Sequence, residues 1–415
     1  MVFGIKNKFK ALDFLQQIQA DSQINLQESE YQGIKITESK SENDTIVYAL
    51  IGSKLLLSEE IDVIKQAIDT YRGEPSLASA SEEMLAQKLD TGDALVRLYV
   101  PNYNNLISQA MAENNSGEMP FDFSTLQPIE STAIGLGVEE GGLRLQSVTR
   151  FNSKQVETSF SANKGKIINR FPEDTVALVS GQGIDEFWSQ AIALLKQDSE
   201  LSKYFNLAKL SVRQATNIDL EQDLFNWMDG EFALGIVPTS ESLIPELDWG
   251  LSAGIVLESS QPEKARETIA KLENTLQQNW EISPSQSKID NKAVTQWQAY
   301  NVPGVLNYGW LDENHLLFTA DNSTFKSIDK PNESLAKSNK FKAIAQKLPR
   351  KNSGYLYIDM AQTVDFWQQL TATETDPEIQ QAIAWFDSIQ SIGSTVTMPD
   401  ESTTQQDLFV LFEDN

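Results

Sequence analysis

The stretch LSAGIVLESSQPEKARETIAKLENTL, residues 251–276, decides the fold class of this chain. Its first seven residues form an apolar run without a breaker, which is typical of a buried strand. Apolar residues then recur at Ala265, Ile269 and Leu272, which is the spacing of one helix face. The stretch therefore predicts a β-strand followed by an amphipathic helix.

A shorter copy of this strand-helix pattern opens the chain. Residues 1–20, MVFGIKNKFKALDFLQQIQA, hold a short apolar run, a Lys-rich turn and apolar residues at Ala11, Leu15 and Ile18. Further matches follow downstream in the same order and at a nearly constant separation. The matched segments are 33–36 with 293–296, 48–51 with 308–311, 55–58 with 316–319, 86–89 with 345–348, 98–100 with 356–358, and 134–135 with 392–393. The whole series predicts an internal duplication.

Hairpin patterns prevail along the chain. Apolar runs split by short polar turns, as in 48–58, 131–151 and 308–319, predict β-hairpins, and helices are interspersed among them. We expect an α+β fold of largely antiparallel sheets with packed helices, and not a doubly wound parallel sheet. The duplication divides the chain into a first lobe, residues 1–165, and a complete, Trp-rich second lobe, residues 166–415.

The front part of the first lobe is missing, because residues 171–250 have no counterpart upstream. Two explanations stay open. Either the first repeat lost its front half in evolution, or the chain is a fragment or shortened form of a longer protein. We favour the second, because a repeat that begins inside a strand-helix unit leaves a sheet edge unpaired.

The composition excludes several classes of function. The chain has 415 residues, with 33 basic and 59 acidic ones, and its net charge of −26 disfavours nucleic acid and anionic membrane surfaces as partners. It has no cysteine and a single histidine, so disulfides, Cys-based catalysis and His-rich zinc sites are excluded. We therefore expect a non-enzymatic protein without catalytic residues, cofactor or resident metal. No apolar run is long enough to cross a bilayer, and we expect the chain as given to be soluble.

The densest carboxylate cluster is formed by Asp219, Glu221 and Asp223. Oxygen-only clusters suit Ca²⁺ or Mg²⁺, but Leu224 stands where an EF-hand loop needs its turn glycine. A short helix from Asp219 to Gly230, with Asp219 as its N-cap, explains the same residues. We favour the cap, and the sequence leaves a metal site open.

Two other patterns invite a catalytic or phosphate-binding interpretation. His315 falls in the predicted hairpin turn 312–315. A catalytic histidine needs an orienting partner and a nucleophile, whereas turns more often supply solvent-exposed histidines, so we interpret His315 as structural. Ser180–Gly183, SGQG, lies between a predicted strand and a predicted helix but lacks the Lys-Ser/Thr ending of a phosphate loop. It predicts a plain strand-to-helix turn.

All eight tryptophans lie in the second lobe. Core packing explains most of them, and an aromatic-lined cavity or interface is the alternative. Trp280, Trp297 and Trp367 have the patterns most compatible with partial exposure. We therefore predict these three as the ligand-binding residues.

Two segments carry a family resemblance: FPEDTVALVS at residues 171–180 and DLEQDLFNWMDGEFAL at residues 219–234. In both, the chain resembles the cyanobacterial family catalogued as domain of unknown function 3352. The resemblance implies a single N-terminal membrane anchor followed by a large extracytoplasmic region, and it brings no enzymatic activity. The chain departs from the family in lacking the anchor and the front half of the first lobe.

These observations lead to two main hypotheses of function. The first is an interaction or scaffolding protein of the cyanobacterial envelope or thylakoid, on the extracytoplasmic side of a membrane, with protein partners that the sequence does not name. Its membrane association would run through a segment absent from this chain. The second is a carrier of an apolar small molecule or lipid in the second lobe. A third, weaker hypothesis is a hydrolase that uses paired carboxylates.

Overall fold

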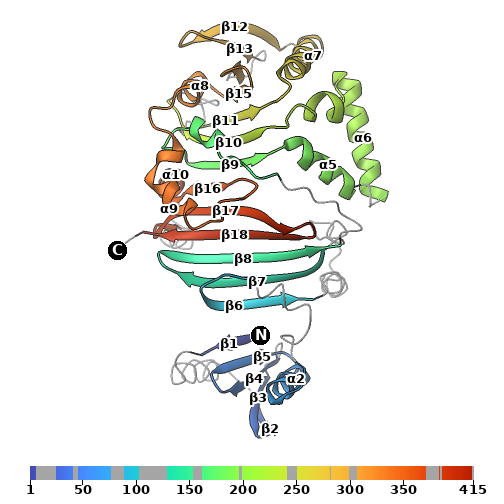
Figure 1. The fold of residues 1–415 in the computed structure, drawn as a ribbon, viewed down its shortest axis with the longest axis vertical. Helices are drawn as coiled ribbons and strands as arrows, with labels where there is room; N and C mark the ends of the chain where they lie inside the picture. The colour runs from blue at the N-terminus through green and yellow to red at the C-terminus, as the bar shows by residue number, and fades with distance from the viewer. Residues whose placement is uncertain are drawn as a thin grey trace. The chain divides into compact units, whose positions relative to one another are not determined.

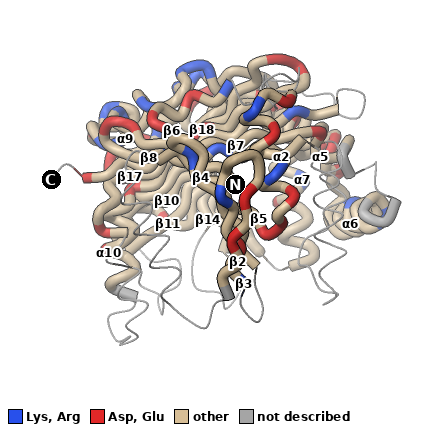
Figure 2. The backbone as a smooth tube through the Cα atoms, turned by 90° about the horizontal axis from the view of Figure 1, so that it is seen from below, with Lys and Arg blue, Asp and Glu red and all other residues tan. Residues whose placement is uncertain are grey.

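The computed structural model describes most of the chain in two compact units. The described residues are 1–5, 25–40, 45–75, 88–101, 129–152, 161–195, 199–240, 250–280, 282–298, 306–370, 383 and 386–413. Unit 1 comprises residues 1–101, 131–139 and 145–148, and unit 2 comprises 102–130, 140–144 and 149–415. Acidic and basic residues are scattered over the elements of both units (Figure 2).

Unit 1 contains an antiparallel sheet of five strands in the order β1-β5-β4-β3-β2 (Figure 1). Its strands are β1 (Val2–Gly4), β2 (Asn25–Tyr31), β3 (Ile34–Lys40), β4 (Thr45–Ile51) and β5 (Lys54–Ser58). Helix α2 (Ile61–Arg72) packs on β3, β4 and β5. Its buried residues Ile64 and Ile68 join Ile36 and Ala49 in one core cluster.

Unit 1 also contains strand β6 (Asp93–Val100), which pairs with β7 (Ile129–Glu139). Strand β7 runs through a turn at Glu140 and Gly141 into β8 (Gly142–Phe151), which confirms the hairpin that the sequence predicts here. A small core of Leu89, Ala133 and Val148 lies under these strands.

The strands that lie wholly in unit 2 follow one another in the order β12-β13-β14-β15-β11-β10-β9-β16-β17-β18, with antiparallel pairing. They are β9 (Ala177–Gln182), β10 (Glu231–Pro238), β11 (Leu251–Glu258), β12 (Ser283–Ile289), β13 (Lys292–Gln298), β14 (Leu306–Trp310), β15 (His315–Thr319), β16 (Leu356–Asp359), β17 (Ile389–Asp400) and β18 (Thr403–Phe412). The α+β fold with antiparallel sheets is thereby confirmed.

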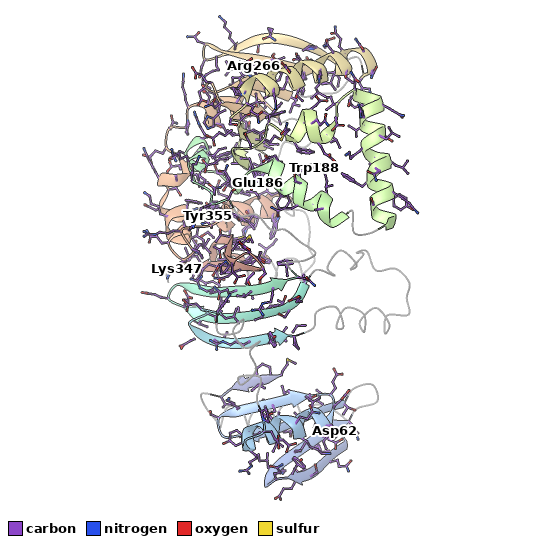
Figure 3. The ribbon with its side chains drawn as sticks, turned by 45° about the vertical axis from the view of Figure 1, so that its right-hand side comes forward. Asp62, Glu186, Trp188, Arg266, Lys347 and Tyr355 are labelled. Carbon is purple, nitrogen blue, oxygen red and sulfur yellow. The ribbon has the colours of Figure 1, made fainter. Side chains whose placement is uncertain are left out.

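Helices pack along this sheet and at its margin. The α-helices of unit 2 are α5 (Ile184–Leu195), α6 (Ser199–Thr216), α7 (Pro262–Trp280), α8 (Asn322–Asp329), α9 (Asn339–Ala345) and α10 (Met360–Leu370). Short turns of other helix types are η4 (Ile167–Arg170), η5 (Leu220–Phe225, a π-helix) and η6 (Leu335–Lys337). Between α5 and α6, Trp188 lies 5.7 Å from the ring of Phe205 (Figure 3).

The opening stretch of the sequence folds as predicted. Residues 251–258 form β11 and residues 262–280 form α7. Ala265 and Ile269 are buried, and Leu272 packs against the same core cluster. The apolar stripe of the helix therefore faces the sheet, as its spacing indicated.

Several predictions need correction or fall elsewhere. Helices α2 and α6 were not predicted. The apolar run 175–180 predicts a strand, and the strand found there, β9, begins at Ala177. The sequence also predicts helices at 82–89 and 376–386, a polar loop at 112–127, and core packing for Trp249 and Trp385. These predictions, like that of a helix near 11–18, fall wholly or largely outside the described residues. The division into lobes 1–165 and 166–415 stays a prediction.

The two units repeat one strand arrangement. The order β1-β5-β4-β3-β2 in unit 1 has the same connectivity as β11-β15-β14-β13-β12 in unit 2. The pairing registers also correspond, because Tyr48 lies opposite Thr37 and Leu57, while Tyr308 lies opposite Thr295 and Phe318. This register aligns Thr37 with Thr295, so the sequence match of 33–36 with 293–296 is wrong by two residues. Among the described residues, no helix combines the length and the apolar character needed to span a membrane.

Candidate functional site

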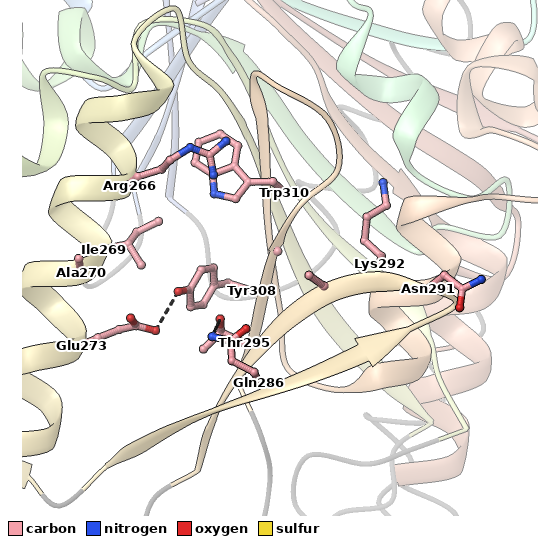
Figure 4. Close-up of a pocket in the computed structure, with 12 residues that line it drawn as sticks. Arg266, Ile269, Ala270, Glu273, Gln286, Asn291, Lys292, Thr295, Tyr308 and Trp310 are labelled. Carbon is pink, nitrogen blue, oxygen red and sulfur yellow. Dashed lines mark hydrogen bonds between the residues drawn. The ribbon is translucent and has the colours of Figure 1, made fainter.

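A groove of about 550 Å³ lies in unit 2 between helix α7 and strands β12 to β14 (Figure 4). Its walls mix charged, polar and aromatic side chains. They are Arg266, Ile269, Ala270 and Glu273 from α7, Gln286 from β12, Asn291, Lys292, Ala293 and Thr295 from the β12–β13 turn and β13, and Tyr308, Gly309 and Trp310 from β14.

The local sequence explains how the two walls form. The α7 residues that line the groove follow the i, i+3, i+4, i+7 spacing, so they lie along one flank of the helix. Opposite them, Asp290 and Asn291 both adopt positive φ angles in the tight turn between β12 and β13. Asp and Asn tolerate this left-handed conformation better than most residues, and the turn brings the two strands into register.

Glu273 organises the aromatic floor of the groove. One of its carboxylate oxygens accepts hydrogen bonds from the hydroxyl of Tyr308, at 2.8 Å, and from the indole N–H of Trp297, at 3.2 Å. The rings of Trp297, Tyr308 and Phe318 pack together, with centroids 5.2 to 6.3 Å apart. Two directed hydrogen bonds to one carboxylate hold both rings in fixed orientations.

Tyr308 is a hydrogen-bond donor in this site and not a base. Burial, together with the hydrogen bond to Glu273 and the negative charge of Glu273, raises the pKa of Tyr308 to about 12, although a hydrogen bond with Thr295 acts in the opposite direction. The hydroxyl therefore keeps its proton at neutral pH.

Arg266 and Lys292 are the two positively charged residues that line the groove. The guanidinium of Arg266 lies 4.0 Å from the ring centroid of Trp310, in a cation–π arrangement that Figure 4 shows. The ion pair of Arg266 with Glu263 is long, at 3.7 Å, so the guanidinium edge stays accessible to a ligand. Lys292 is held more firmly, because it bonds Asp329 at 3.0 Å and the carbonyl of Leu311 at 2.5 Å.

The three tryptophans predicted to bind a ligand lie in three different environments. Trp297 is buried beneath the groove, whereas Trp280 is the last residue of α7 and is 57% exposed. Trp367 lies on α10, where its ring meets Phe386 edge-on at 5.6 Å.

These positions do not form one shared site. Helix α10 packs on β16 and β17. Five strands lie between β16 and β13, so the two are six inter-strand spacings apart, which is roughly 29 Å at about 4.8 Å per spacing. The ligand-binding role of each tryptophan stays a prediction.

The sequence interpretation missed Trp310 and Arg266. Tyr308 and Trp310 alternate with Gly309 on β14, so both side chains reach the same face of the sheet. That alternation, together with Arg266 and Glu273 two turns apart on α7, is the signal that could have identified the groove.

The acidic cluster at residues 219–223 is held by basic partners. Asp219 caps η5 by accepting hydrogen bonds from the backbone N–H groups of Glu221 and Gln222. Glu221 pairs with Lys209, and Asp223 pairs with Lys271 at 2.7 Å. The Asp219 cap is therefore confirmed, but the helix is a short π-helix that ends at Phe225, well before Gly230.

These contacts also bear on the hydrolase hypothesis. A hydrogen bond from Lys271 and another from the backbone lower the pKa of Asp223. A carboxyl group that acts as a general acid needs a raised pKa, so Asp223 is unsuited to that role. Asp185 has a raised pKa, chiefly through burial and further through the charges of Asp229 and Glu186.

The remaining two patterns are structural. The predicted turn at residues 180–183 is wrong in its extent, because Ser180 to Gln182 belong to strand β9 and pair with β10. Only Gly183, with a positive φ, joins β9 to α5. His315 is the first residue of β15 and lies outside the turn that precedes it. Its Nδ1 lies 2.7 Å from a carboxylate oxygen of Asp312, which also pairs with Arg170.

The comparison with family models identifies one family. Residues 1–412 match the model described as protein of unknown function (DUF3352). The chain belongs to this family. A DUF3352 match over nearly the whole chain agrees with the resemblance at residues 171–180 and 219–234, and the family description leaves the function open. The comparison with curated proteins finds no match.

Proposed function

We propose that this protein is a non-enzymatic interaction protein whose groove beside α7 binds a segment of a partner polypeptide. The observation that carries the proposal is the arrangement of Arg266 on Trp310 next to the pair formed by Glu273 and Tyr308. These groups are already oriented by contacts within the protein. Binding of a ligand that fits these groups therefore costs little conformational entropy of the side chains.

The lining favours a partner segment with an acidic and an aromatic or aliphatic side chain. The free edge of the Arg266 guanidinium can bind a carboxylate, and the alkyl and ring surfaces of Ile269, Ala270 and Trp310 suit an apolar side chain. Asn291 supplies hydrogen-bonding groups for a peptide backbone, and Gln286, whose amide donates a hydrogen bond to Thr295 at 2.9 Å, keeps its side-chain carbonyl for the same purpose.

The alternative, a carrier of an apolar molecule or lipid, fits this lining less well. Burying Arg266 and Lys292 under an apolar ligand would remove their hydration without replacing it. The aromatic cluster of Trp297, Tyr308 and Phe318 already packs on itself beneath the groove. We therefore place the scaffold before the carrier.

The proposal includes an internal duplication and a cellular location. The matching strand orders and pairing registers of the two sheets support the duplication. The resemblance to the cyanobacterial family supports an extracytoplasmic location at the envelope or thylakoid membrane, with an anchor outside the sequence given.

The test is an array of immobilised short peptides that vary in acidic, basic and aromatic content, probed with the purified chain. We expect retention on peptides that combine acidic and aromatic residues. Replacing Arg266 with Gln should weaken binding by about tenfold, the effect of losing a charged hydrogen bond. Arg350→Gln, at an exposed arginine away from the groove, is the matched control and should bind like the native chain.

Two outcomes would count against the proposal. Equal binding by the Arg266→Gln variant would remove the groove from the interaction. A lipid or pigment that co-purifies with the native chain, is identified by mass spectrometry and is lost in the Arg266→Gln variant would favour the carrier.

A further inference from the structure

Helix α6 has one face against the protein and one face open to solvent. On its inner side, Phe205 packs near Trp188, and Lys209 pairs with Glu221 of η5. The helix also packs along α7, where Thr275 donates a hydrogen bond to the carbonyl of Thr216 at 2.8 Å. These contacts fix which side of α6 faces outward.

The outward side carries large apolar side chains. Tyr204, Leu207 and Leu210 are 70%, 60% and 50% exposed, respectively. They follow one another at intervals of three residues, so they form a continuous strip along the helix. We call these three residues the α6 strip. Contiguous exposed apolar side chains of this kind mark interaction surfaces more often than isolated ones do.

Basic side chains flank the α6 strip. From Lys203 to Thr216 the helix has three basic residues and no acidic one, in a chain whose net charge is −26. Lys203 and Arg213 are exposed, and basic residues are visible on α6 in Figure 2. Upstream of this basic run, the first turn of the helix contains one acidic residue, Glu200. The ion pair of Arg213 with Asp219 is long, at 3.7 Å, and leaves its guanidinium free to turn outward.

We propose that the outward face of α6, formed by the α6 strip with Lys203 and Arg213, binds the surface of an anionic lipid bilayer. Amphipathic helices with Leu and aromatic residues on one face and Lys or Arg beside them lie in the interface of such bilayers. The long basic side chains reach the phosphates while the apolar strip enters the acyl boundary. Exposed charge acts within about a Debye length, roughly 8–10 Å, so local charge at α6 outweighs distant acidic residues.

The observations favour a bilayer over two other occupants. A second copy of this helix would bring Lys203 and Arg213 of both copies together, and like charges would repel. A protein partner would have to offer a groove that matches a convex helix, whereas a fluid bilayer adapts to it. The acidic remainder of the protein is repelled by anionic lipid, so α6 is the face with which the protein approaches. This proposal concerns a surface separate from the groove beside α7 and does not depend on it.

The test is flotation of the purified chain with phosphatidylcholine vesicles prepared with and without phosphatidylglycerol. We expect the native chain to float with the anionic vesicles, and to float less at high salt. The double variant Leu207→Gln/Leu210→Gln should lose binding by at least roughly tenfold, because two apolar side chains no longer enter the bilayer. Lys203→Glu/Arg213→Gln should lose its preference for anionic vesicles.

The matched control is Val63→Gln/Tyr71→Gln on α2, where the replaced side chains are exposed to a similar degree and the two basic residues of the helix are balanced by two acidic ones. Circular dichroism establishes that each variant is folded. A native chain that stays with the unbound fraction would overturn the proposal. So would equal flotation of the α6 and α2 variants, or binding to a soluble acidic polymer without binding to vesicles.

Discussion

The sheet of unit 1 and its counterpart in unit 2 share strand order and register but differ in the side chains they present. The pair Thr37 and Tyr48 in unit 1 corresponds to Thr295 and Tyr308 in unit 2. By the same pairing, Trp297, Trp310 and Phe318 of unit 2 correspond to Ser39, Leu50 and Leu57 of unit 1. One backbone plan therefore carries an aromatic, charged groove in one unit and lacks those aromatic residues in the other.

The helices that follow the two hairpins differ as well. Asp321, the N-cap of α8, accepts hydrogen bonds from the N–H and the hydroxyl of Thr324, at 2.7 and 2.8 Å. Glu60, the N-cap of α2, makes no side-chain capping bond. The helix that follows the hairpin in unit 2 therefore begins with a side-chain cap, and the corresponding helix in unit 1 does not.

The largest effect should come from Phe325→Ala in α8. Phe325 is fully buried and packs against β14 at Gly309, so its loss should lower the free energy of unfolding by about 3–5 kcal/mol. Urea unfolding followed by tryptophan fluorescence reports on unit 2, because no tryptophan precedes residue 171. The corresponding Ile64→Ala in α2 should leave that transition in place. If Ile64→Ala shifts it equally, the two units unfold as one.

The second-largest loss in the free energy of unfolding should come from Glu273→Gln. Removing the charge that accepts two hydrogen bonds should cost about 1.5–3 kcal/mol. The pKa of Tyr308, about 12 in the native chain, should fall towards its usual value of 10 while burial keeps it raised. Ultraviolet titration of tyrosinate measures this, with Tyr308→Phe to identify the signal.

The same tyrosine gives a pH dependence with a defined sign. Its pKa is raised in the folded state, so its stabilising contribution is complete below pH 10 and is lost as the pH rises towards about 12. In Tyr308→Phe this alkaline component should disappear. Its persistence would assign the loss to another group.

The two helix caps should differ by a smaller amount. Asp321→Ala should destabilise α8 by about 0.5–2 kcal/mol, whereas Glu60→Ala should change α2 little, because it removes no capping bond. Hydrogen exchange measured on peptides from α2 and α8 reports each helix separately. Equal loss of protection in both variants would contradict the difference between the caps.

The smallest effect should come from Asp312→Asn in the turn before β15. Burial opposes ionisation there, but hydrogen bonds from His315 and the N–H of Asn314, with the charges of His315 and Arg170, lower the pKa of Asp312 to about 2. The contribution of Asp312 is therefore present above its usual pKa and is lost as the pH falls towards 2. Acid unfolding of the native chain should show this component, and the Asn variant should lack it.

The sequence predicted the fold class and the strand-helix unit at residues 251–276 because both have strong periods. Helix α2 was missed although Ile61, Ile64 and Ile68 have helical spacing and Gly73 ends the helix. Helix α6 was missed because its apolar residues lie on two faces, Phe205 inward and Leu207 outward, which obscures the period.

The groove was only partly predictable. The number of tryptophans pointed to unit 2, but the sequence does not show which of them are exposed. The buried Trp297 was therefore predicted to bind a ligand, whereas Trp310, which lines the groove, was not. The contact of Arg266 with Trp310 joins residues from α7 and β14. Such a contact depends on how a helix packs across a sheet, which neither local pattern contains.

Gly309 gives the comparison an evolutionary meaning. A Cβ placed there would lie 2.9 Å from the Phe325 ring and 3.0 Å from the carbonyl of Ala293, so the strand accepts no side chain at this point. In unit 1 the corresponding positions hold Ala49 and Ile64. The strand residue Ala49 is larger than Gly309, and the helix residue Ile64 is smaller than Phe325. If the copies share an ancestor, the two sites are epistatic: Gly had to be present on the strand before Phe could be fixed on the helix.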